Sequence, residues 1–406
     1  MRQSGDSLFK QSSFTKFWTS RILSSTSSQM LSVAIGWQMY EVTKDAFSLG
    51  MVGLAQFLPM VLLTFVVGHV ADRYERRRIV YICQIIDSLV AGLLLWGSIE
   101  GWIGREQILA AAAILGVTRS FEGTSASSLL PQLIEKKLLQ QAISISTTAG
   151  QTSQILGPMV GGLLYGVGAG YVYGTASAAL LIGAVMTYLI RLKEQPVRSK
   201  EPVTLRSVFL GLEFVIRHPL ILGTISLDLF AVLLGGATAL LPIFAKDILH
   251  AGPLGLGLLR TAPAIGALIV SLILAYYPLK KAIGMKLFAA LAVFGLATML
   301  FAVSTNLVVS VIALLLIGGS DVISVVIRSS LVQLQTPDEM RGRVNAVNSL
   351  FIGTSNQLGE FESGTVAGFT GAVPAALIGG VGTIIVAGLW MYLFPSLRKI
   401  RSLAGN

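Results

Sequence analysis

Apolar runs of about 20 residues recur along the whole chain, and each run is long enough for a helix to cross a bilayer. In lipid, only helices and closed barrels satisfy every backbone hydrogen bond. Charged residues make up 12% of the sequence, against roughly 25% in ordinary soluble domains. We therefore predict an all-α integral membrane protein with about twelve spans, near residues 17–40, 48–70, 79–99, 107–131, 140–165, 170–191, 219–245, 254–275, 284–303, 307–333, 343–368 and 373–394.

Lysine and arginine residues gather in every second loop between these spans. If the N-terminus is placed inside, the outer loops receive only Lys44, Arg105 and Lys246. Cytoplasmic loops carry such an excess of basic residues, so both termini are predicted to be cytoplasmic. Basic loops beside an anionic leaflet explain the net charge of +10, and we expect membrane lipid, not nucleic acid, as their partner. The start of the sequence lacks the short apolar core of a cleavable signal peptide, so we expect none.

The two halves of the chain repeat each other. Ser127-Ser128-Leu129 recurs as Ser329-Ser330-Leu331, and the same offset of 202 residues aligns Thr152-Ser153 with Thr354-Ser355. Duplicated halves are typical of secondary transporters, whose sites lie near the middle of the membrane. We predict six-helix bundles at residues 1–192 and 219–406, joined by a cytoplasmic linker at 193–218.

The linker has apolar residues at helical spacing, namely Leu205, Val208, Phe209, Leu212 and Ile216. This spacing predicts a short amphipathic helix. Such a helix either lies along the inner membrane surface or is a plain linker helix with no separate role.

A dense group of charges, GHVADRYERRR at residues 68–78, separates the second predicted span from the third. We predict an inner loop here, in which Gly68 allows close helix approach. Asp72 would lie near helix starts, where free backbone N–H groups favour an anion. A basic loop that fixes the topology would explain the arginines, but it would leave Asp72 unexplained.

The spacing of this loop resembles the signature loop of the major facilitator superfamily, which it matches at Gly68, Asp72, Arg73, Arg76 and Arg77. Glu75 stands where the family usually has a glycine, and the equivalent loop of the second half, AYYPLKKAIG, has no acid. The resemblance implies that Asp72 locks an inner gate. Its candidate partners are Arg341 and Arg343, at the start of the eleventh span.

Two further motifs are similar to elements of the same superfamily. In the fourth span, Arg119-Ser-Phe-Glu122-Gly123 resembles an R-x-x-x-G element whose arginine is associated with proton transfer. In the fifth span, Gly157-Pro158-Met-Val-Gly161-Gly162 resembles the antiporter motif of proton-driven exporters. Helix packing alone would explain the glycines, and a helix kink would explain the proline. The order and location of all three motifs together favour the family.

Three longer stretches narrow the resemblance: ADRYERRR, RHPL at residues 217–220, and QLQTPDEMRGRVNAVNS at residues 333–349. They are similar to the branch that contains the bacterial enterobactin exporter and related siderophore and macrolide efflux proteins. The resemblance implies two pseudo-symmetric six-helix bundles in the bacterial inner membrane and no enzymatic activity. It also implies proton-coupled export of an amphiphilic small molecule by alternating access.

Several ionisable residues fall inside predicted spans, where a charge costs about 3 kcal/mol or more. The fourth, fifth, tenth and eleventh spans are expected to be the least hydrophobic and to face protein or water. The superfamily arrangement places spans one, four, seven and ten around a central cavity. The proton-coupling candidates are Arg119, Glu122, Asp228, Asp321 and, in the eleventh span, Glu360; the substrate-cavity candidates are Arg21, Gln29 and Arg328.

The partners of these residues are open at this point. Arg119 and Glu122 are three residues apart and can pair with each other. Asp321 takes the register position of Arg119 in the repeat, so opposite charges would face each other across the cavity. Asp321 also lies two turns, about 10 Å, from Arg328, which is too far for direct pairing. Asp228 is a protonation candidate, with a capping or packing role as the alternative.

Three other acids are harder to assign. Glu360 and Glu362 are two residues apart and point in different directions, so only one of them faces any given partner, such as Arg260 or Arg21. Asp87, in the third span, is interpreted as structural.

Other chemistry has little support in the sequence. The three histidines are far apart and Cys83 is the only cysteine, so we expect no metal cluster and no disulfide. No G-x-x-x-x-G-K-[ST] loop is present, so we expect neither ATP nor another cofactor. The competing functions are an importer or uniporter of the same fold, a metal-ion exporter, and a transport-incompetent sensor or assembly partner.

Overall fold

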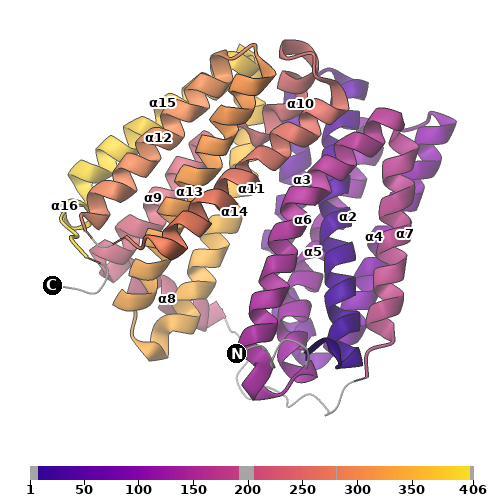
Figure 1. Ribbon diagram of the computed structural model, residues 1–406, viewed down its shortest axis with the longest axis horizontal. Coiled ribbons are helices and arrows are strands. Elements are labelled where there is room, and N and C mark those ends of the chain that lie inside the picture. The colour runs from indigo at the N-terminus through magenta and orange to yellow at the C-terminus, as the bar shows by residue number, and fades with distance from the viewer. Residues whose placement is uncertain (1–7, 192–204, 280, 403–406) are drawn as a thin grey trace. The chain divides into compact units, whose positions relative to one another are not determined.

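The computed structural model describes residues 8–191, 205–279 and 281–402, and within them it contains helices and no strands (Figure 1). The helices are α2 (Ser12–Thr43), α3 (Ala46–Arg73), α4 (Arg76–Glu100), α5 (Arg105–Leu133), η1 (Lys136–Leu138), α6 (Leu139–Val167), α7 (Ala169–Tyr188), α8 (Leu205–Arg217), α9 (Pro219–Gly235), η2 (Ala237–Leu240), α10 (Leu241–Ile243), the π-helical turn η3 (Phe244–Ile248), α11 (Gly252–Tyr276), α12 (Ile283–Val303), α13 (Leu307–Gln335), α14 (Asp338–Thr370), α15 (Ala372–Leu393) and α16 (Pro395–Arg398). The predicted all-α class is confirmed.

Among the described residues, 8 helices are long and apolar enough to cross a membrane. The long helices α2, α5, α6 and α14 are more polar, and together with those eight they are consistent with about twelve crossings. The expectation for the tenth span was wrong, because an 18-residue stretch of α13 has a mean hydropathy of 2.3, the highest value among the eight helices. Most of its polar residues lie in its second half, from Ser320 to Gln335, and its first half is rich in leucine, isoleucine and valine.

The chain divides into two compact units. The first contains Met1–Val42 and Ala55–Val203, and the second contains Thr43–Leu54 and Thr204–Asn406. In the first unit α4 packs along α5 and α7, and in the second α13 packs along α11 and α12 (Figure 1). The boundary falls inside α3, whose first turns pack on α14 in the second unit, where a Cβ on Gly50 would lie 3.0 Å from Gly364 Cα.

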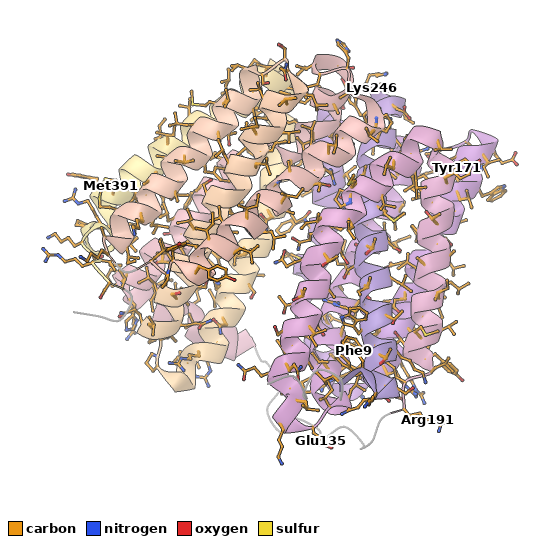
Figure 2. The ribbon with its side chains drawn as sticks, in the orientation of Figure 1. Phe9, Glu135, Tyr171, Arg191, Lys246 and Met391 are labelled. Atoms are coloured by element: carbon orange, nitrogen blue, oxygen red, sulfur yellow. The ribbon has the colours of Figure 1, made fainter. Side chains whose placement is uncertain are left out.

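The ends of the first unit agree with the predicted sorting of its loops. Figure 2 shows Phe9, Glu135 and Arg191 at one end of this unit and Tyr171 at the other. The loops that contain Glu135 and Arg191 were both predicted to lie on the inner side, so the structure gathers them as the alternation of charge requires.

The charge-dense stretch at residues 68–78 is not the loop that we predicted. Helix α3 continues to Arg73 and α4 begins at Arg76, so only Tyr74 and Glu75 connect them. A Cβ on Gly68 would meet nothing within 4 Å, and the role of this glycine in close helix approach stays a prediction. Arginine is a good helix former, and a high density of charge therefore does not mark the end of a helix.

The predicted amphipathic helix is present as α8. Val215 is 1% exposed and packs with Ile221, Val332, Val344 and Val347 from α9, α13 and α14. Leu212 and Phe214 are partly buried in the same cluster, whereas Leu210 and Ile216 are 39% and 56% exposed. One face of α8 therefore packs on its own unit and part of its apolar surface stays exposed, so both interpretations of this helix stay predictions.

Candidate functional site

A small polar cavity lies inside the first unit, with a volume of about 40 Å³. Its lining includes the ionisable side chains of Asp87, Arg119 and Glu122, the amide of Gln56, and the α2 serines Ser28 and Ser32. A water molecule needs about 10–15 Å³ of such volume and two to four polar partners. The cavity therefore has the size and polarity for water and protons, but it is too small for a siderophore.

Glu122, on α5, is held by hydrogen bonds from two other helices. Its Oε1 accepts from Ser24 Oγ of α2 at 2.7 Å and from Gln84 Nε2 of α4 at 2.9 Å. Gln84 Nε2 also donates to Ser20 Oγ at 3.0 Å, and its Oε1 accepts from Thr187 Oγ1 at 3.2 Å. The predicted pairing of Glu122 with Arg119 is not among the ion pairs of the described residues, and the donors to Glu122 Oε1 are a serine and a glutamine.

Asp87 belongs to this cavity, although we had interpreted it only as a structural residue. It accepts a hydrogen bond from Thr118 Oγ1 and interacts electrostatically with Arg119, which is itself more than one-third exposed. The sequence carried one local signal for this placement: Gln84 and Asp87 are three residues apart and share a face of α4.

The second unit contains a buried ion pair that joins α9 to α13. Arg328 Nη1 binds Asp228 Oδ2, and the two side chains are 8% and 9% exposed. Arg328 Nε also donates to Ser324 Oγ at 3.0 Å. Asp228 has no basic residue close to it along the sequence, and its partner in space is Arg328, 100 residues further along the chain.

Asp321 lies on the same helix as Arg328 and completes a group of two acids and one base. It interacts electrostatically with Arg328 and with Asp228. The described ion pairs do not join it directly to Arg328. Its predicted placement opposite Arg119 stays a prediction.

The acids of α14 have different surroundings. Glu360 interacts electrostatically with Arg260 of α11, as the sequence suggested. Its side chain lies against Gly53, where an added Cβ would be 3.1 Å from Glu360 Oε2. Glu362 accepts a hydrogen bond from Ser363 Oγ at 3.3 Å. Of these two acids, Glu360 is therefore the one placed beside a basic residue.

The antiporter motif packs α6 against α2. A Cβ on Gly161 would lie 3.0 Å from Met30 Cα, and one on Gly157 would collide with the side chain of Gln29. Pro158 and Gly162 are also buried in α6. Gln29, a predicted cavity residue, is thus a packing partner of the motif.

Arg21 and Gln29 are both partly buried on α2. Neither lines the cavity described above, which α2 reaches instead through Ser28, Leu31, Ser32 and Ile35. The substrate roles of Arg21 and Gln29 stay predictions.

The charge-dense stretch ties together one end of the first unit. Glu75 binds Arg77 Nε at 2.7 Å and Arg78 Nε at 2.8 Å. Arg76 Nη1 donates to Ser128 O of α5 at 3.0 Å, and Arg77 Nη1 donates to Ile190 O, just beyond α7, at 2.6 Å. The residue that replaces the family glycine therefore neutralises two neighbouring arginines.

The predicted gate is described only in part. The side chain of Asp72 lies outside the described residues, and Arg73 is exposed at the end of α3. Arg341 Nε donates to Gln333 O at 3.3 Å, and Arg343 Nη1 contacts Met340 Sδ at 3.4 Å. A gate between Asp72 and these arginines stays a prediction.

No group of three or more His, Cys, Asp or Glu side chains within the described part of the chain is arranged to hold a metal ion.

Comparison with known proteins places these features in a family. The sequence model of the transmembrane secretion effector family matches residues 3–404. The enterobactin exporter EntS of Citrobacter koseri is 26% identical over 397 residues, which cover 96% of this chain and 93% of that protein. EntS of Salmonella typhimurium is 26% identical over 399 residues, covering 96% and 94%.

Solved structures show the same fold. The nucleoside transporter NupG has a TM-score of 0.72 at 15% identity, covering 94% of this chain and 99% of that chain. A bacterial homologue of the iron transporter ferroportin, in an inward-facing state, has a TM-score of 0.70 at 17% identity, covering 93% and 98%. Since the family match extends over almost the whole sequence, this multi-pass membrane protein belongs to the transmembrane secretion effector family of the major facilitator superfamily.

Proposed function

We propose that this protein is a proton-coupled exporter of an amphiphilic small molecule in the bacterial inner membrane, with a siderophore as the first candidate substrate. The EntS relatives are enterobactin exporters, and the family is one of secretion effectors, which supports outward transport. A drug-like compound is the second substrate class, because the sequence also resembles macrolide efflux proteins. The basic loops support an orientation with both termini in the cytoplasm.

The observation that carries this proposal is the group formed by Asp228, Arg328 and Asp321. When all three side chains are ionised, the group has one net negative charge. Such a charge inside the membrane is costly, and the binding of one proton removes it. Cycles of protonation can therefore be coupled to the alternating exposure by which these transporters work.

The cavity at Asp87, Arg119 and Glu122 offers a second place for protons. Its volume of about 40 Å³ admits water and excludes a siderophore. The substrate is therefore proposed to bind elsewhere, with Arg21 and Gln29 as candidate contacts. No nucleotide takes part, so the proton gradient supplies the energy.

Transport by inside-out membrane vesicles tests the proposal, with enterobactin as the probe. An acidified lumen should drive its accumulation, and a proton ionophore should abolish it. Asp321→Asn should keep enterobactin binding but lose accumulation. The matched control is Asp247→Asn, an exposed aspartate of the same unit outside this group.

The competing functions give different results in the same assay. Accumulation that persists after the proton gradient has been collapsed overturns proton coupling. Equilibration without accumulation identifies a uniporter, and flux in the opposite direction identifies an importer. Transport of divalent cations but not of enterobactin identifies a metal exporter. Binding without flux identifies a sensor or assembly partner.

A further inference from the structure

A groove opens on the second unit between α11 and α12. Helix α13 packs along both of these helices, while α11 and α12 make few contacts with each other (Figure 1). The space between them, above α13, has a volume of about 460 Å³. This volume falls within the roughly 300–1,000 Å³ of typical ligand sites.

Backbone packing explains why α13 forms the floor of the groove. A Cβ on Gly266 of α11 would collide with the backbone of Leu315, and one on Gly318 of α13 would collide with the backbone of Pro263. These glycines bring α11 and α13 into close contact. Leu315, Leu316, Gly319 and Ile323 then line the groove from α13.

The lining is basic at one end and otherwise apolar except for Ser320, whose hydroxyl donates to Leu316 O of its own helix. From α12 it includes Lys286, Ala289, Ala290 and Val293. Lys286 and Val293 are about 10 Å apart along the helix axis, so the groove extends from the first turn of α12 toward its middle. Ala289 is exposed, and Val293 is 43% exposed. Both lie on α12, a helix apolar enough to cross the membrane.

Lys286 has an exposed side chain, and the described ion pairs include none with this ammonium group. The sequence places it with Lys281 on the predicted cytoplasmic side. Basic pockets between membrane helices on that side are binding sites for anionic lipid headgroups. An apolar channel that starts at a lysine matches the two chemical parts of such a lipid.

We propose that this groove binds an anionic phospholipid of the inner leaflet, with the headgroup phosphate at Lys286 and one acyl chain lying along Ala289 and Val293 toward Leu315. The charge of Lys286 selects the headgroup, and the apolar walls exclude water from the chain. The site is separate from the charged group of Asp228, Arg328 and Asp321, and it does not depend on which substrate is exported.

Thermal unfolding of the full chain in detergent, with and without added lipid, tests the proposal. Phosphatidylglycerol should raise the midpoint temperature more than phosphatidylethanolamine does, because a ligand that binds the folded state stabilises it. Lys286→Gln should weaken phosphatidylglycerol binding about fivefold, which corresponds to about 1 kcal/mol for one basic side chain at an anionic surface. Lys286→Arg should restore it.

Matched variants separate the groove from general surface effects. Lys399→Gln removes an exposed lysine outside the groove and should leave binding unchanged. Ala289→Phe fills the groove and should abolish the lipid-dependent shift, whereas Leu296→Phe, at an exposed position of α12 outside the lining, should not. Each variant is first compared without lipid, so that a loss of folding is recognised.

Three outcomes overturn the proposal. If Lys286→Gln and Lys399→Gln weaken phosphatidylglycerol binding equally, the positive charge attracts the lipid nonspecifically. Binding that survives Ala289→Phe means that no acyl chain enters the groove. An equal temperature shift with phosphatidylethanolamine means that the headgroup charge is not recognised.

Discussion

Arg328 of α13 forms an ion pair with Asp228 of α9, and both side chains are less than one-tenth exposed. A second acid, Asp321, acts electrostatically on the same pair. Removal of one partner of a buried pair leaves an uncompensated charge, which costs about 3–5 kcal/mol. The cost here depends on which partner is removed, because the group has two acids and one base.

Arg328→Gln should therefore destabilise the protein more than Asp228→Asn. The first change leaves two carboxylates without a base, whereas the second leaves Arg328 with Asp321 as a neighbouring acid. Asp321→Asn should cost the least, because the original pair remains. Thermal unfolding in detergent measures this order, and equal losses in all three variants would show that the group does not act as a unit.

A double variant adds an internal control. Asp228→Asn combined with Arg328→Gln should be less destabilised than the sum of the two single variants, because no unpaired charge of this pair remains. Ser329→Ala, at a partly buried neighbouring position whose hydroxyl donates to Val325 O of the same helix, should have almost no effect. Exact additivity of the two changes would contradict the pairing.

The Glu122 network supports a second prediction. Gln84→Leu removes the amide that bonds to Glu122, Ser20 and Thr187, whereas Ser24→Ala removes one donor only. A buried polar group left without its partner costs about 1–3 kcal/mol. We expect Gln84→Leu to lower the unfolding temperature more than Ser24→Ala does.

The exposed residue Gln140 provides the control for this change of residue type. Gln140→Leu should leave the unfolding temperature nearly unchanged. If Gln84→Leu behaves in the same way, the hydrogen bonds of this network do not contribute to stability.

The sequence predicted the fold better than it predicted the partners of the buried charges. Apolar runs and the sorting of basic residues act locally, so they indicate the helices directly. Asp228 and Arg328 are far apart in the chain, so no local sequence pattern predicts that they pair. Helical spacing places Asp321 two turns from Arg328, and the described ion pairs do not join these two residues.

The contacts of Asp87 could not be predicted from the sequence either. Its interpretation as a structural residue came from the position of its span in the family arrangement, not from its own neighbours. Only packing of α4 against α5 brings it to Thr118 and Arg119. The direction of a side chain around a helix that is apolar on several faces cannot be derived from periodicity.

The charge-dense connection supports a third prediction. Glu75→Gln removes ion pairs with Arg77 and Arg78 that are partly exposed, so we expect a loss of less than about 1 kcal/mol that shrinks in high salt. Arg77→Ala also removes the hydrogen bond to Ile190 O, which connects α4 to the end of α7. The loss of stability in Arg77→Ala should be larger than in Glu75→Gln and should persist in high salt.

Unfolding temperatures at low and high sodium chloride distinguish the two effects. Arg78→Ala is the matched control, because the described hydrogen bonds of its side chain lead to Glu75 alone. If Arg77→Ala and Arg78→Ala are equally destabilised, the bond to Ile190 does not stabilise this end of the unit.

The glycines of the antiporter motif support a fourth prediction, which separates packing from helix propensity. Gly161→Ala places a methyl group 3.0 Å from Met30 Cα, a main-chain contact that only a shift of α2 or α6 can relieve. Gly150, in the same helix, would meet nothing within 4 Å, and Gly150→Ala should stabilise the protein by about 0.5–1 kcal/mol through helix propensity. We therefore expect opposite changes in unfolding temperature for the same substitution at two positions of α6. Stabilisation of both variants would mean that the motif does not hold α6 against α2, and the role of its glycines would have to come from something other than close packing.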